Sequence, residues 1–237
     1  MLSLIIPAYN EENRIGKTLE VFYDYMQKTF SEFEMIVVDD GSTDDTLLLL
    51  KKYQENMPCL KVLTYEKNRG KGGAVKFGVE NAVGDYVFFT DADMPYGIEN
   101  VEVAAEVFEK TGADVVLGKR EQAKNGKKYP WYRTFFSKGF SLMVKIVLGI
   151  WEEDTQCGFK GFKAESAKKI FSKGRLEGWG FDVEIFFLAK KYGMKIERIC
   201  VELSHDKEGS KISVLRDSLN MFCELLKVRK NDRMGLY

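Results

Sequence analysis

One pattern repeats along the first 120 residues: a short apolar segment, then a polar loop, then a segment with the apolar spacing of a helix. The predicted strands cover residues 2–7, 34–38, 61–65, 86–90 and 114–118. Helices are predicted over residues 15–25, 46–53 and 99–110, with one more ending at residue 82. Such alternation is typical of a parallel, doubly wound sheet with helices on both faces. We therefore predict an α/β fold built on a mostly parallel, twisted sheet.

Beyond residue 120 the alternation becomes irregular. Residues 122–128 are polar and basic, and they precede predicted helices at 131–150, 164–171, 181–192 and 212–230 and strands near 160 and at 195–203. No internal repeat, low-complexity tract or clear linker interrupts the chain. We expect a single domain over residues 1–237, with residues 1–120 and 121–237 as its two halves.

Unusual polar loops follow the predicted strands of the first half. These loops span residues 8–13, 39–45, 67–73 and 91–95. Because ligands of open α/β sheets bind outside the carboxyl ends of the strands, we expect the four loops to line one binding site.

The fourth loop carries two carboxylates, Asp91 and Asp93, directly after a buried strand. Two neighbouring acids at such a position repel each other and lose hydration unless a cation compensates. Mg²⁺ binds one or two carboxylates together with phosphate oxygens, so this loop is a candidate site for a metal and a diphosphate. The alternative is an ordinary acidic turn that caps the next helix.

The second and third loops each permit two interpretations. Residues 39–42 either cap a helix or place one of their two carboxylates against a nucleobase or ribose hydroxyl. Residues 67–73 are glycine-rich and contain Arg69 and Lys71, so they resemble a phosphate cradle, although a basic turn without a ligand is an alternative. The loop lacks the spacing of a P-loop, so ATPase chemistry is not indicated.

Two predicted helices of the second half are amphipathic. The apolar arc of residues 131–150 is wide and aromatic, so this helix either packs into the core or lies in a membrane interface. The last helix ends in Lys227, Arg229, Lys230 and Arg233, which would attract anionic headgroups.

Composition excludes several classes of function. The formal net charge is zero, with 36 basic and 36 acidic residues, so nucleic-acid binding has no general electrostatic support. The single histidine, His205, argues against histidine-rich metal sites and Ser-His-Asp catalysis. The 4 cysteines are scattered and are expected to be free thiols in a reducing compartment. We see no signal peptide and no apolar run long enough to span a bilayer.

Seven motifs together resemble the inverting family-2 glycosyltransferases of the GT-A fold. Four are found across that family, at residues 7–11 (PAYNE), 38–44 (VDDGSTD), 68–74 (NRGKGGA) and 91–93 (DAD). Residues 154–160 (DTQCGFK), 178–184 (GWGFDVE) and 209–211 (GSK) are more specific and resemble the branch that glycosylates polyprenyl or dolichyl phosphates. The resemblance implies a nucleotide-sugar donor, preferably UDP-glucose, with Mg²⁺ or Mn²⁺ as cofactor.

The resemblance also implies a role for individual residues. The donor half, residues 1–120, would bind the nucleoside through Pro7, Ala8, Tyr9, Glu11 and Asp39. The sugar diphosphate and metal would lie near Lys71, Asp91, Ala92 and Asp93, with Asp91 and Asp93 as metal ligands and Asp93 as a catalytic residue. The acceptor half, residues 121–237, would use Asp154 as a catalytic residue and Gln156 near the sugar and acceptor. The phosphates of the substrates would contact Arg120, Arg133 and Lys211.

The expected reaction is attack by a lipid phosphate on the anomeric carbon. A phosphate monoester has a second pKa of about 6, so the nucleophile is already ionised and needs no strong base. Asp154 would then orient the acceptor or sugar, although a role as base is an alternative. Pro95 replaces the Gln typical of related mannosyl enzymes, which argues mildly against GDP-mannose.

Other functions are possible from the sequence alone. They are transfer to a hydroxyl of a glycan or protein, a silent protein that binds a nucleotide sugar or a membrane, and nucleotidyl transfer. Eukaryotic enzymes of the resembled type carry an N-terminal membrane segment that this chain lacks. We therefore expect a cytoplasmic protein, peripheral on the inner face of the membrane through its amphipathic helices.

Overall fold

A computed structural model describes residues 1–237 except 94–95, 121–130, 152–153, 156, 179 and 203–213. In two helices, the side chains are described only from residues 139 and 220 onward. Gln156 and Lys211 of the predicted site lie outside the described residues, as does the side chain of Arg133.

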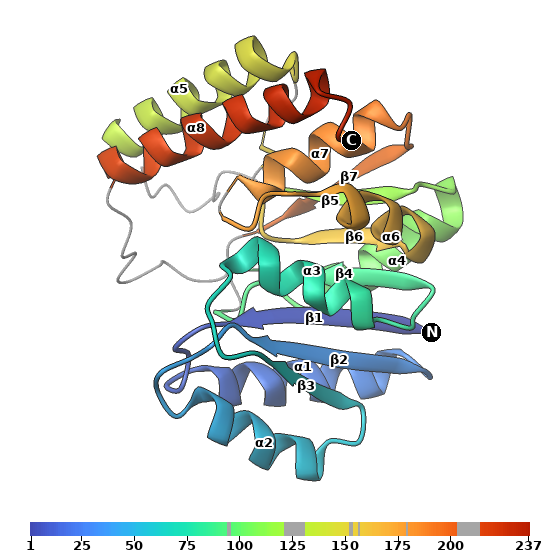
Figure 1. Ribbon diagram of the computed structural model, residues 1–237. Helices are drawn as coiled ribbons and strands as arrows, with labels where there is room; N and C mark the ends of the chain where they lie inside the picture. The colour runs from blue at the N-terminus through green and yellow to red at the C-terminus, as the bar shows by residue number, and fades with distance from the viewer. Residues whose placement is uncertain (94–95, 121–130, 152–153, 156, 179, 203–213) are drawn as a thin grey trace.

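The described strands form one seven-stranded sheet in the order β3-β2-β1-β4-β6-β5-β7 (Figure 1). The strands are β1 (Leu2–Ala8), β2 (Phe33–Asp39), β3 (Leu60–Thr64), β4 (Tyr86–Phe89), β5 (Val115–Arg120), β6 (Lys160–Lys163) and β7 (Ile196–Val201). β1 pairs in parallel with β2 and β4, β2 with β3, and β5 with β7. The predicted α/β fold with a mostly parallel sheet is confirmed.

β6 is the exception, because it runs antiparallel to both of its neighbours, β4 and β5. It lies between two strands that follow each other in the first-half pattern, so a segment from the second half completes the sheet. Gly161 makes this insertion possible: a Cβ there would come within 2.6 Å of the Phe88 ring. The insertion brings the loop before β6, which contains Asp154, to the edge of the sheet where β4 ends.

Helices cover both faces of the sheet, as predicted (Figure 1). They are α1 (Ile15–Thr29), α2 (Thr46–Asn56), α3 (Lys71–Asn81), α4 (Asn100–Thr111), α5 (Trp131–Leu148), α6 (Ala164–Lys173), α7 (Phe181–Lys191) and α8 (Val214–Arg233). Along β1, Ile5 packs in one core cluster while Leu4 and Ile6 pack in the other. This alternation is the side-chain period of a strand with both faces buried.

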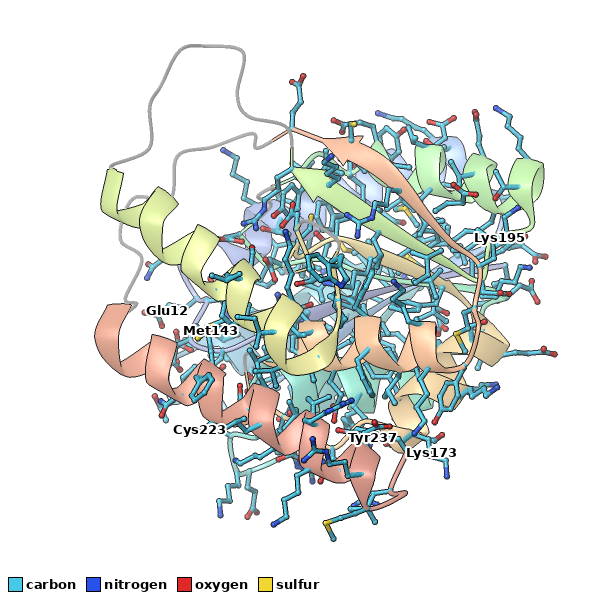
Figure 2. The ribbon with its side chains drawn as sticks, turned by 90° about the horizontal axis from the view of Figure 1, so that it is seen from above. Glu12, Met143, Lys173, Lys195, Cys223 and Tyr237 are labelled. Carbon is cyan, nitrogen blue, oxygen red and sulfur yellow. The ribbon has the colours of Figure 1, made fainter. Side chains whose placement is uncertain are left out.

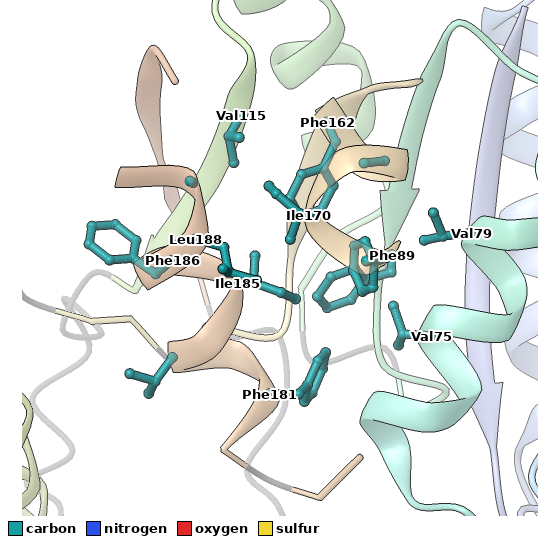
Figure 3. Close-up of a cluster of buried hydrophobic side chains, with 14 of the residues drawn as sticks. Val75, Val79, Phe89, Val115, Phe162, Ile170, Phe181, Ile185, Phe186 and Leu188 are labelled. Carbon is teal, nitrogen blue, oxygen red and sulfur yellow. The ribbon is translucent and has the colours of Figure 1, made fainter. Parts of the chain in front are cut away.

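The first core cluster joins the sheet to helices α3, α6 and α7. Phe89 of β4, Phe162 of β6 and Phe181 of α7 lie next to one another in it (Figure 3). The second cluster packs α1, α2 and α4 against the opposite face. The site-bearing loops therefore emerge from a sheet that is fixed on both sides.

α5 and α8 pack against each other and lie above α7 (Figures 1 and 2). Val144 of α5 and Leu225 of α8 are buried in the first cluster. In contrast, Ile146 and the following Trp151 are each 75% exposed. The described part of α5 thus combines core packing with an exposed apolar side. In the described part of the chain, no helix is long and apolar enough to cross a membrane.

Candidate functional site

The first two predicted loops interlock at the carboxyl ends of β1 and β2. Asn10 adopts the left-handed region, with φ of 54°, and its backbone N–H donates to Ser42 Oγ at 3.0 Å. Asn10 Oδ1 in turn accepts from the backbone N–H of Thr43 at 2.8 Å. The backbone N–H of Glu11 donates to Thr46 Oγ1, also at 2.8 Å. These reciprocal bonds make one wall out of two loops that are distant in the sequence.

This wall brings together several of the residues predicted to bind the nucleoside. Ala8 and Asp39 are direct partners at the ends of β1 and β2, and Pro7 pairs with Val38 one position earlier. Tyr9 follows with 46% of its surface exposed, which leaves its ring available for stacking. Asp39 is buried and accepts from the backbone N–H of Ser42 at 3.3 Å and from Thr64 Oγ1 at 3.0 Å.

Asp40 forms hydrogen bonds with the third loop. Its Oδ1 accepts from the Tyr65 hydroxyl and from the backbone N–H of Arg69, both at 2.7 Å. Its carbonyl accepts from the Asn68 side-chain amide at 3.0 Å. Asp40 therefore fastens the second loop to the third.

The glycine-rich third loop packs against protein, which corrects its interpretation as a backbone phosphate cradle. The N–H groups of Gly72 and Gly73 both donate to the Glu177 carbonyl, at 2.8 and 3.4 Å. A Cβ on Gly72 would approach Phe181 Cβ to 2.8 Å, so glycine is needed for this contact. The Arg69 guanidinium lies 4.4 Å from the centre of the Tyr65 ring. Among these groups, the two amides are already bonded and the arginine is stacked.

Lys71 is the member of the third loop that reaches the acidic loop. Its ammonium forms an ion pair with Asp91 Oδ1. Burial lowers the pKa of Lys71, but Asp91 and then Asp182 more than offset this, so the pKa lies above its usual value. Lys71 therefore stays positively charged at neutral pH.

The acidic loop itself is anchored through its central residue. Ala92 is buried, and its carbonyl accepts from Thr18 Oγ1 of α1 at 2.6 Å. Asp93 is close enough to Glu11 to influence its ionisation. Burial raises the pKa of Glu11, the Arg14 ion pair opposes this, and the charge of Asp93 raises it further. Asp91 and Asp93 both act on the charge of Lys71, and Glu11 lies within electrostatic reach of Asp93.

Asp154 forms a multidentate pair with Arg120. The Arg120 backbone N–H donates to Asp154 Oδ2 at 2.7 Å, and the guanidinium donates to Oδ1 at 2.5 Å through Nη2 and 3.0 Å through Nε. Burial lowers the pKa of Arg120, but the hydrogen bonds to Asp154 raise it above its usual value. Asp154 has φ of 52°, a conformation uncommon outside glycine, so the backbone is shaped to present this carboxylate.

The sequence predictions did not anticipate this pairing, because Arg120 was expected to meet phosphates and Asp154 the sugar and acceptor. In the described structure, Arg120 and Asp154 form an ion pair with each other. The loop of Asp154 nevertheless reaches the acidic loop: a Cβ on Gly158 would collide with the Asp91 carboxylate. The structure therefore joins the Asp154 loop to Asp91 at one edge of the sheet.

Two further residue pairs near the site were missed by the sequence predictions. Lys160 donates to Asp182 Oδ1 at 2.5 Å and to the Cys157 carbonyl at 2.6 Å. Tyr96 is buried beside Cys157, and burial raises the pKa of its phenol. The sequence held one signal for the first pair, because Lys160 lies inside the apolar run 157–162. A charge buried in such a run requires a partner of opposite charge.

Asp91 and Asp93 are suited to a metal that shares its coordination sphere with a substrate. Within the described ranges, no three His, Cys, Asp or Glu side chains are grouped to hold a metal ion. Carboxylate oxygens are hard ligands that suit Mg²⁺ or Mn²⁺, and these ions also bind phosphate oxygens and water. The donor set therefore suits a cation that arrives together with a diphosphate.

Comparison with known proteins places this arrangement in a family. The family model described as glycosyl transferase family 2 matches residues 3–171. A dolichyl-phosphate beta-glucosyltransferase of Dictyostelium discoideum is 32% identical over 249 residues, covering 100% of this chain and 76% of the relative. The enzyme of the same name from Saccharomyces cerevisiae is 33% identical, with 100% and 76% covered. The human one is 32% identical, with 96% and 74% covered.

Solved structures support the fold. Glucosyl-3-phosphoglycerate synthase from Mycobacterium tuberculosis, in complex with UDP, superposes with a TM-score of 0.72 at 18% identity, covering 97% of this chain and 80% of that one. Its complex with Mn²⁺, UDP-glucose and phosphoglyceric acid gives a TM-score of 0.70 at 17% identity, with 97% and 80% covered.

Proposed function

Because the chain belongs to glycosyl transferase family 2, we propose that it transfers glucose from UDP-glucose to a polyprenyl phosphate such as dolichyl phosphate, with inversion at the anomeric carbon. The observation that carries this proposal is the similarity to dolichyl-phosphate beta-glucosyltransferases over the whole chain. That similarity continues past residue 171, where the family model ends, into the segments proposed to bind the acceptor.

The donor would bind along the carboxyl ends of β1, β2 and β4. Tyr9 supplies an exposed ring for the base, and Asp39 a carboxylate at the end of β2 for the base or ribose. Pro7 and Ala8 would line the bottom of the nucleoside site between Tyr9 and Asp39, and Glu11 would line its side. The complexes of the structurally similar synthase contain UDP and UDP-glucose, which agrees with a uridine donor.

Asp91 and Asp93 would hold a divalent cation together with the donor diphosphate, with Ala92 setting the spacing between them. When bound, the cation neutralises the charge that develops on the departing diphosphate. Lys71 adds a positive charge on the same side of the site.

The acceptor phosphate would attack from the side of the loop that carries Asp154 and Gln156. A bond forms between a phosphate oxygen and the anomeric carbon while the bond to UDP breaks, so no proton has to move at neutral pH. Asp154, which is held in place by its ion pair with Arg120, then orients the sugar or acceptor. Arg120, Arg133 and Lys211 are proposed to attract the acceptor phosphate, since bringing two anions together requires positive charge.

A hydroxyl acceptor is the competing proposal, and it would require a general base. Asp154 is the candidate, but both of its oxygens accept hydrogen bonds from Arg120. To act as base, Asp154 would have to take the proton on an oxygen that already accepts from Arg120. This contact favours the phosphate acceptor.

The lipid acceptor implies a membrane surface, and we propose that α5 and α8 meet it on the cytoplasmic, inner face. Leu142, Ile146 and Trp151 are exposed on or after α5, and Leu226 is exposed on α8. Lys227 and Lys230 of α8 are also exposed and would add attraction to anionic headgroups.

The test is a transfer assay with purified protein and Mn²⁺. We expect UDP release and a glucosylated lipid phosphate from UDP-glucose and dolichyl phosphate, and no product with the corresponding polyprenol. GDP-mannose in place of UDP-glucose reports donor choice. Transfer to the polyprenol, or release of pyrophosphate in place of UDP, would contradict the proposal.

A further inference from the structure

Lys71 occupies the carboxylate that the proposed metal would need. Its ammonium contacts Asp91 Oδ1, and the two side chains are only 17% and 21% exposed. The contact joins the first residue of α3 to the loop after β4, so it bridges two separate loops of the site. A metal ion and an ammonium group cannot share one carboxylate oxygen without strong repulsion.

The backbone around Lys71 is held firmly, so only its side chain can respond. Gly70 has φ of 83°, and a Cβ there would lie 2.7 Å from the Glu177 carbonyl oxygen. The next two amides donate to that same carbonyl. The Lys71 ammonium also lies 5.8 Å from the centre of the Phe181 ring.

A second carboxylate lies within electrostatic reach of Lys71. Asp182 lies in the first turn of α7 and pairs with Lys160. It directly follows Phe181, whose ring centre lies 5.8 Å from the Lys71 ammonium. The Lys71 ammonium can therefore leave Asp91 while remaining near negative charge. A bound donor diphosphate would offer it a further anionic partner.

We propose that Lys71 is a tethered cation that competes with the divalent metal for Asp91 and couples metal binding to nucleotide binding. In the absence of ligands, Lys71 neutralises Asp91 and reduces its repulsion with Asp93. Metal binding has to displace this ammonium, so the metal alone binds weakly. When UDP is present, the displaced Lys71 contacts the diphosphate, so each ligand strengthens the binding of the other. This inference rests on the proposed donor and metal sites.

The test measures Mn²⁺ binding to the full chain by electron paramagnetic resonance, with and without UDP, and needs no transfer. Lys71→Met removes the charge and keeps the apolar stem. We expect this variant to bind Mn²⁺ alone several-fold more tightly than the unaltered protein, and to gain less from UDP. Coupling of this kind typically amounts to about 5- to 150-fold in affinity.

The matched control is Lys52→Met, because Lys52 is exposed on α2, outside the loops of the site, and carries the same charge. It should bind Mn²⁺ like the unaltered protein. Lys71→Gln repeats the test if circular dichroism shows that the Met variant does not fold. Equal or weaker binding of Mn²⁺ alone by a folded Lys71 variant, or an unchanged gain from UDP, would overturn the inference.

The outcomes also separate this inference from the proposed function. Mn²⁺ binding that depends on Lys71 as expected, with no glucosyl transfer to any lipid phosphate, would support the coupling and contradict the acceptor. Failure of the unaltered protein to bind Mn²⁺ even with UDP would overturn both.

Discussion

Lys160 of β6 and Asp182 of α7 form an ion pair of 2.5 Å, and their side chains are only 1% and 6% exposed. Lys160 also binds the Cys157 carbonyl, so the pair fastens the Asp154 loop to the start of α7. The loop before α7 in turn accepts the amides of the Lys71 helix through the Glu177 carbonyl. The Lys160–Asp182 pair thus connects, inside the core, the proposed donor side of the site to its proposed acceptor side.

Removing one member of this pair should be costly. Asp182→Leu leaves the Lys160 charge buried without its partner, and we expect the free energy of unfolding to fall by about 3–5 kcal/mol. Adding Lys160→Met should recover part of that loss, since the unpaired charge is then gone. Urea denaturation measures both. Losses that simply add in the double variant would show that the two charges do not interact in this way.

The close contact at Gly72 should not tolerate a methyl group. Gly72→Ala would press against Phe181 and the Glu177 carbonyl, and overpacking of this kind costs about 1–3 kcal/mol. Thermal unfolding reports the change. Gly139→Ala is the matched control, because it lies in helix α5 with nothing within 4 Å, and there alanine should stabilise by about 0.5–1 kcal/mol. Equal effects at both positions would refute the packing argument.

The role of Asp154 can be read from the pH dependence of transfer. Asp154→Asn keeps the shape but loses the ion pair with Arg120, and we expect kcat to fall by about 100-fold through misplacement. The pH–rate profile should keep its shape, because an ionised phosphate acceptor needs no base. Suppose instead that the rate of the unaltered enzyme falls at low pH and that this fall is absent in the Asn variant. That result would identify Asp154 as the base.

Glu11 should make the metal-free protein less stable as pH rises. Its pKa is raised in the folded state, mainly by burial, so the folded protein binds its proton more tightly than the unfolded chain does. Stability from this group is therefore present below the usual pKa of 4.5 and is lost as pH rises through the higher folded value. Glu11→Gln should flatten this part of a plot of melting temperature against pH. A steeper fall in the Gln variant would contradict the assignment.

Membrane attachment through α5 is testable with anionic vesicles. Ile146→Ser and Trp151→Ser should each weaken binding by about tenfold or more, since burying one large apolar side chain contributes about 1.5–3 kcal/mol. Co-sedimentation with phosphatidylserine vesicles measures this. Val83→Ser is the control, because Val83 is also exposed but follows α3. Unchanged binding in both α5-region variants would exclude this surface as the membrane contact.

Local sequence patterns predicted the elements well. The strand and helix periods at residues 2–120 match β1 to β5 and α1 to α4, and the later helices also appear where their apolar spacing indicated. These features depend on residues close together in the chain, and short-range spacing therefore encodes them.

The partners of the charged side chains could not be predicted in the same way. Lys71 was expected near the donor, and it forms an ion pair with Asp91. Arg120 was expected to meet phosphates, and it forms an ion pair with Asp154. The glycines beside Lys71 suggested a phosphate cradle, but they serve contact with a loop about 100 residues later. The same glycine pattern suits a close approach by a phosphate or by a carbonyl, and the sequence alone does not distinguish the two.

By itself, the sequence determined an α/β chain whose polar and acidic loops lie at the carboxyl ends of parallel strands, because apolar periodicity and strand direction are local properties. Only the tertiary structure decided that β6 enters the sheet in reverse and brings Asp154 beside the loop of Asp91. It also decided which charges pair. Those outcomes depend on packing between segments far apart in the chain, where an ion pair forms only between groups that the fold has brought within a few ångströms.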